Sequence, residues 1–203
     1  MLQSLTQKLR ERRYGDPIVV VSGLPRSGTS MMMRMLVGGG LEAFTDEERV
    51  ADVDNPKGYF EFERVKNLEK DPDRSWVKGA RGQTLKVISF LLPFLPDDNR
   101  YRIIFLRRHL DEILASQTKM LDRLGTQDDA EAEMMREAFR NQIAAARIHV
   151  RKQPNMDILE INYADTVGNP TSTAQKVNAF LGGILDEKGM AEAVDPSLYR
   201  NRA

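Results

Sequence analysis

The 203-residue sequence contains no cysteine and only two histidines, His109 and His149. The absence of cysteine excludes disulfide bonds and thiolate metal sites. Two histidines are also too few for a histidine-rich metal centre. We therefore expect a site that works without a metal ion.

The sequence also lacks net charge and long apolar runs. Thirty basic and thirty acidic residues cancel, so overall charge favours neither nucleic acid nor an anionic membrane as a partner, and any anion site must be local. The longest apolar runs are interrupted by Pro93 or by charged residues, which predicts no membrane span. Residues 1–14 are basic and amphipathic but lack the continuous apolar centre of a secretory signal. We expect an exposed first helix on a cytoplasmic protein.

What is present is a strand, a glycine loop and a helix near the start of the chain. Residues 18–21 are four consecutive β-formers, typical of a strand buried on both faces of a parallel sheet. Gly23 and Gly28 follow, and then an apolar run of helical character. In α/β proteins this arrangement directs loop amides and a helix N-terminus at one anion.

The spacing Gly23-x-x-x-x-Gly28 is that of a nucleotide P-loop, but Thr29 stands where such a loop carries lysine. A positive charge is still present as Arg26, and Thr29 and Ser30 offer amides and hydroxyls. Two alternatives stay open at this point. The loop is a glycine turn that holds no ligand, or the chain is a magnesium-dependent ATP or GTP kinase or hydrolase.

The remaining pattern predicts a three-layer α/β/α fold of the P-loop-like type, with a central, mostly parallel sheet. An apolar content of 41% fits a single domain over residues 1–203. Beyond the first strand and its helix at 28–37, we expect strands at 84–89, 101–106 and 156–161, a short helix or turn at 90–95, and helices at 110–121, 128–152, 169–181 and 187–194. Residues 41–81 are irregular and polar, and such a long segment usually lines a site.

The third predicted strand ends in Arg107-Arg108-His109. Ligands of open parallel sheets bind outside the carboxyl ends of strands, so Arg108 and the 23–30 loop should share one edge. A magnesium NTPase would have an acidic residue at the end of such a strand. The arginines therefore favour a ligand with an additional phosphate.

Two motifs together resemble the sulfotransferases that use 3′-phosphoadenosine 5′-phosphosulfate (PAPS). The first is Pro25-Arg26-Ser27-Gly28-Thr29-Ser30 and the second is the pair Arg108…Ser116. The likeness covers residues 17–122 and, more weakly, 162–170 and 180–182. It implies that the loop binds the 5′-phosphosulfate and that Arg108 with Ser116 binds the 3′-phosphate. The two cationic pockets, around Arg26 and around Arg108, would then hold an adenosine with phosphate at both ends.

The resemblance also implies the reaction. A sulfuryl group would pass from PAPS to a hydroxyl or amine of a small-molecule or peptide acceptor, giving 3′,5′-ADP. Arg26 would stabilise the developing charge, with Lys86 as a further cation. Around the loop the sequence is most similar to the tyrosylprotein sulfotransferase branch, because Asp46-Glu47-Glu48-Arg49-Val50 matches its acidic segment and places Glu47 at the position of the catalytic base.

The sequence departs from cytosolic members of that family at three points. No histidine follows Lys86, Met31 stands where those members have tryptophan, and the glycine-rich Arg-Lys-Gly segment is missing. His109 is an alternative base because it adjoins Arg108. The departures also leave open a relative that binds nucleotide without turnover.

Overall fold

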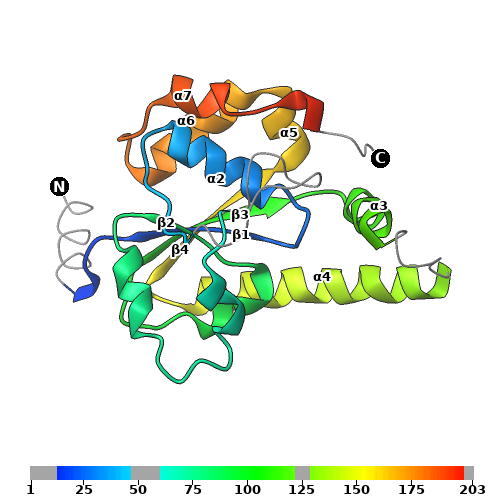
Figure 1. Ribbon diagram of the computed structural model, residues 1–203, viewed down its shortest axis with the longest axis horizontal. Coiled ribbons are helices and arrows are strands. Elements are labelled where there is room, and N and C mark those ends of the chain that lie inside the picture. The colour runs from blue at the N-terminus through cyan, green and yellow to red at the C-terminus, as the bar shows by residue number, and fades with distance from the viewer. Residues whose placement is uncertain (1–12, 47–59, 122–128, 199–203) are drawn as a thin grey trace.

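Four parallel strands form the centre of the protein, in the order β2-β1-β3-β4. The computed structural model describes residues 13–46, 60–121 and 129–198. Figure 1 shows helices above and below this sheet. The strands are β1 (Ile18–Gly23), β2 (Thr84–Lys86), β3 (Tyr101–Arg107) and β4 (Met156–Asn162).

Two layers of helices cover the sheet, which confirms the predicted α/β/α architecture. The α-helices of the described residues are α2 (Thr29–Gly38), α3 (Leu110–Leu121), α4 (Asp129–Lys152), α5 (Tyr163–Gly168), α6 (Pro170–Leu181) and α7 (Glu187–Glu192). Short 3-10 turns are η1 (Glu63–Asn67), η2 (Ser75–Ala80), η3 (Ser89–Phe94) and η4 (Pro196–Leu198). In Figure 1, α2, α5, α6 and α7 lie on one face, whereas α4 lies on the other.

Successive side chains of β1 point to opposite faces of the sheet, and both faces are covered by helices. Ile18 and Val20 pack into the cluster that includes α4, and Val19 and Val21 pack into the cluster beneath α2, α6 and α7. Burying one such side chain contributes about 1.5–3 kcal/mol. A polar residue at any of these positions would therefore weaken the contact of one helical layer with the sheet.

Two local predictions needed correction. The strand expected over residues 84–89 ends at Lys86, because β2 is an edge strand whose partner β1 runs only two residues further before its loop. The helix α5 was not predicted. It begins because the Asn162 side chain accepts hydrogen bonds from the amides of Ala164 and Asp165, at 2.8 and 3.3 Å. Most of the predicted helix over residues 1–14 lies outside the described residues.

The strand order positions the functional edge. β2 and β3 lie on opposite sides of β1, so the carboxyl end of β1 is a switch point of the topology, the place where ligands of open parallel sheets usually bind. Gly23 pairs with Leu106, and Arg107 pairs with Asn162, which aligns the ends of β1, β3 and β4. Within the described part of the chain, no helix has the length and apolar character needed to cross a bilayer.

Candidate functional site

The loop after β1 leads into α2 with its amides available to an anion. Gly28 is the N-cap of α2, with φ 102°, and no side chain caps the helix. The first turn also contains no acidic residue. The N–H groups and the dipole of this helix end therefore favour a bound anion.

Arg26 ties this loop to α3. Its Nε donates a hydrogen bond to Ser116 Oγ at 2.9 Å, across 90 residues of sequence. Its φ of 65° is unusual for a residue other than glycine. Backbone conformations of this kind are costly and concentrate at functional sites, where the surrounding structure holds them.

Arg108 holds the same loop from the end of β3. Its Nη1 donates to the Arg26 carbonyl oxygen at 3.1 Å, and its Nε donates to Glu112 Oε2 at 2.7 Å. The guanidinium lies 4.4 Å from the centre of the Tyr163 ring, a cation–π distance. The side chains of Arg108 and Glu112 are only 8% and 6% exposed, so the pair is strongly fixed.

Tyr163 is the packing partner of both the loop and Arg108. Burial raises the pKa of its hydroxyl, and the positive charge of Arg108 opposes that rise. A Cβ atom added at Gly28 would meet the Tyr163 ring, so glycine is needed where the loop passes over this side chain. The start of α5 thus supports the glycine loop directly.

Lys86 approaches the loop from the end of β2. Its Nζ lies 3.3 Å from Ser30 Oγ and 3.2 Å from Glu61 Oε1, and its side chain is 9% exposed. Glu61 follows Phe60, which has a φ of 52°. A cation and a carboxylate therefore lie together beside the first turn of α2.

The structure brings most of the predicted residues to one edge. Those that share it are Pro25, Arg26, Ser27, Gly28, Thr29, Ser30, Arg108 and Ser116. We expected Ser116 to act with Arg108. In the structure, the Ser116 hydroxyl accepts a hydrogen bond from Arg26. Glu47 lies outside the described residues. His109 is exposed, and its Nδ1 is 3.3 Å from Asp111 Oδ2.

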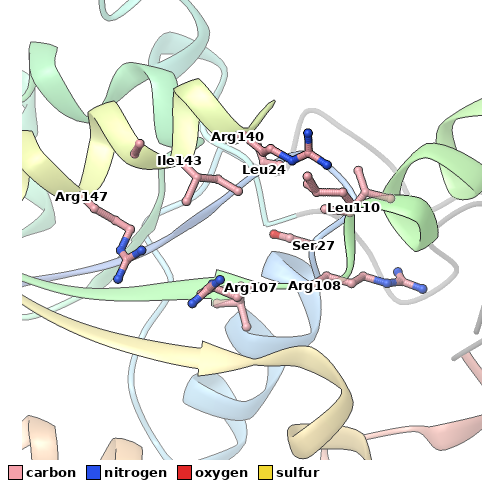
Figure 2. Close-up of a pocket in the computed structure, with 11 residues that line it drawn as sticks. Leu24, Ser27, Arg107, Arg108, Leu110, Arg140, Ile143 and Arg147 are labelled. Atoms are coloured by element: carbon pink, nitrogen blue, oxygen red, sulfur yellow. The ribbon is translucent and has the colours of Figure 1, made fainter. Parts of the chain in front are cut away.

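A cavity of about 360 Å³ opens beside the loop, between the end of β3, α3 and α4 (Figure 2). Ser27 contributes to its wall and is 1% exposed. Arg140 and Arg147 reach it from α4. The sequence reasoning missed them, although arginines seven residues apart, with Ile143 and Ala144 between them, occupy one helix face. Among the residues that the structure describes, no cluster of histidine, aspartate and glutamate could hold a metal ion.

A central parallel sheet with a glycine loop at its switch point, leading into an uncapped helix N-terminus, defines a P-loop-like α/β protein. The sulfotransferase family model matches residues 40–187, so the chain belongs to the sulfotransferase family. That match confirms the family expected from the two motifs and does not distinguish its tyrosylprotein branch.

Solved sulfotransferase domains have the same fold. The sulfotransferase domain from the curacin biosynthetic pathway has a TM-score of 0.55 at 16% identity, over 89% of this chain and 78% of that domain. The sulfotransferase domain of the Synechococcus PCC 7002 olefin synthase has a TM-score of 0.54 at 19% identity, over 94% and 90%. No curated protein sequence matches the chain significantly.

Proposed function

We propose that this sulfotransferase-family chain uses PAPS as its donor and transfers the sulfuryl group to a hydroxyl or amine, releasing 3′,5′-ADP. The contact between Arg26 Nε and Ser116 Oγ carries the proposal, because it joins the two signature motifs into one surface. The carbonyl of Arg26 also accepts from Arg108. The α2 N-terminus, Arg26 and the Arg108–Ser116 region thus lie side by side, which supports the proposal that they bind the anionic groups of one nucleotide.

In the proposed reaction the acceptor O–H or N–H gives its proton to a carboxylate. A bond forms between the acceptor atom and sulfur, and the bond from sulfur to the bridging phosphate oxygen breaks. 3′,5′-ADP leaves with that electron pair. By analogy with loose phosphoryl transfer, alignment and charge stabilisation supply most of the rate.

Several groups of this chain suit those needs. Arg26, the α2 amides and Lys86 would stabilise charge on the transferring group and on the leaving oxygen. Glu47 is our first proposal for the general base. Glu61 is a second candidate, because its carboxylate is 3.2 Å from Lys86 Nζ and hence beside the loop.

The donor assignment is tested by calorimetry of the free protein with 3′,5′-ADP, AMP, and ATP with magnesium. We expect 3′,5′-ADP to bind most tightly, because only this nucleotide presents phosphate to both cationic regions. One charged hydrogen bond contributes about 1.5–3 kcal/mol, equivalent to roughly 10–100-fold in affinity over AMP. Equal binding of AMP and 3′,5′-ADP would overturn the assignment, and a preference for ATP with magnesium would favour a kinase or hydrolase.

Variants assign the roles within the site. Arg26→Ala should lower turnover by about 10²–10³-fold with saturating PAPS, the usual effect of losing one charge-stabilising donor. Ser116→Ala should weaken the binding of 3′,5′-ADP more than that of AMP, because it removes a proposed 3′-phosphate contact and also releases Arg26 from its hydrogen bond. Arg107→Gln, which removes a neighbouring charge that is 52% exposed, should change neither affinity. Near-full activity of Arg26→Ala would contradict its role.

A further inference from the structure

The cavity beside the loop is strongly asymmetric in charge. Four arginines line it, Arg107 and Arg108 from the end of β3 and Arg140 and Arg147 from α4. Its described lining residues include no aspartate or glutamate. The rest of the wall is largely apolar, formed by Leu24, Leu106, Leu110, Ile113, Ile143 and Ala144.

Nearby carboxylates cancel only part of this charge. Glu160 lies close to three arginines, with Arg107, Arg147 and Arg151 nitrogens at 3.4, 2.7 and 3.6 Å. Elsewhere the charges balance: Glu133 and Asp111 pair with Arg136 and Arg140, and Glu112 pairs with Arg108. The single carboxylate of Glu160 facing three guanidiniums leaves a local excess of positive charge on the side of Arg107 and Arg147.

A second, independent observation points to a ligand in this space. The Ser27 hydroxyl is buried and has no hydrogen-bond partner. Buried polar groups without partners are uncommon and costly. Figure 2 shows this hydroxyl pointing toward the side of the cavity where Arg107 and Arg147 lie. The cavity therefore has a polar group at its loop end and the guanidiniums of Arg107 and Arg147 on the side toward which that group points.

We propose that this cavity is the acceptor site and that the acceptor is an amphipathic organic anion. Its carboxylate or phosphate would bind the arginines, since the guanidinium fork matches both groups. Its apolar body would lie against the leucine and isoleucine side chains, with the reacting hydroxyl or amine at the Ser27 end. A volume of about 360 Å³ is within the range of small-molecule sites. The inference rests on the proposed sulfuryl transfer.

The binding test is done without PAPS, so no probe can be sulfated, and the phenyl end of each probe has no hydroxyl. Calorimetry compares 3-phenylpropanoate, 2-phenylethyl phosphate and the uncharged 3-phenyl-1-propanol, with and without 3′,5′-ADP. Both anions should bind at least about tenfold more tightly than the alcohol, as expected for a charge-assisted contact. The tighter of the two anions identifies the preferred head group. Equal binding of all three probes would overturn the proposal.

Arg147→Gln and Arg151→Gln form a matched pair of variants. The two arginines lie one turn apart on α4 and both face Glu160, but only Arg147 lines the cavity. Arg147→Gln should lower the affinity for both anions about tenfold, whereas Arg151→Gln should change that affinity less than about twofold. Equal losses in the two variants would mean a diffuse charge effect and would refute the assigned site.

Turnover separates failure of this inference from failure of the sulfotransferase proposal. With PAPS, 3-(4-hydroxyphenyl)propanoate should have a lower KM than 4-propylphenol, and Arg147→Gln should raise the KM of the carboxylate alone. Sulfation of both phenols with equal KM would refute the anionic acceptor while leaving the reaction in place. No 3′,5′-ADP binding and no transfer would refute the reaction itself, and with it the acceptor role of the cavity.

Discussion

Replacing Gly28 by alanine should destabilise the protein and disturb the site in a single step. Gly28 has a φ of 102°, in the left-handed region, and its added Cβ would meet the ring of Tyr163. The Cε2 atom of that ring would be only 2.9 Å away. Because Tyr163 is 6% exposed and packs under Arg108, the ring has little room to move.

Two contributions set the magnitude. A left-handed conformation costs a non-glycine residue about 1–2 kcal/mol. Overpacking against the buried ring adds about 1–3 kcal/mol. We therefore expect Gly28→Ala to lower the free energy of unfolding by about 2–5 kcal/mol. Gly40→Ala is the control, because Gly40 has a φ of 94° but nothing within 4 Å of an added Cβ, so only the first cost applies.

The measurement is urea unfolding followed by the fluorescence of Trp76, the sole tryptophan of the chain. Gly28→Ala should also weaken 3′,5′-ADP binding, because a displaced Tyr163 no longer supports Arg108, whereas Gly40→Ala should not. Adding Tyr163→Leu to Gly28→Ala should recover part of the lost stability. The packing argument is refuted if the two glycine variants agree within about 0.5 kcal/mol.

Three further predictions concern the base, acid stability and the start of α5. Turnover is compared between Glu47→Gln and Glu61→Gln. The variant that removes the general base should lower turnover about 10²–10⁴-fold, while calorimetry shows an unchanged affinity for 3′,5′-ADP. A lost affinity for 3′,5′-ADP would instead indicate a structural role of that glutamate. The hydrogen bond from Arg64 lowers the pKa of the Asp71 carboxyl below its ordinary value of 3.8. The ionised carboxylate therefore stabilises the fold fully above pH 3.8, and this contribution is lost as the pH falls through the lowered pKa. In urea titrations between pH 2 and 6, Asp71→Asn should therefore lose less stability on acidification than the wild type, and an unchanged pH dependence would contradict this. Asn162→Ala should lower the free energy of unfolding by about 0.5–2 kcal/mol, because the helix cap is lost. Asn162→Asp should retain most of the stability, since aspartate can also cap a helix; equal losses in the two variants would argue against capping.

Local sequence patterns were sufficient for the framework of the site. The β-branched run of β1, the spacing of Gly23 and Gly28, and the arginines at the end of β3 each depend on neighbours within a few residues. The strand over 84–89 was predicted too long because an edge strand is limited by its partner, which sequence windows do not contain. The helix α5 was missed because six residues show little periodicity, although Asn162 provided a capping signal.

By itself, the sequence determined that a glycine loop with Arg26 follows a buried strand and that Arg108 ends another, because strand burial and turn chemistry are encoded locally. Only the tertiary structure decided that Arg26 reaches Ser116, that Arg108 lies on the Tyr163 ring, and that arginines of α4 line a cavity at the loop. The contact between Arg26 and Ser116 alone joins residues 90 apart in the sequence. These contacts form because two helical layers bring their segments to one edge of the sheet, an outcome of packing over the whole domain.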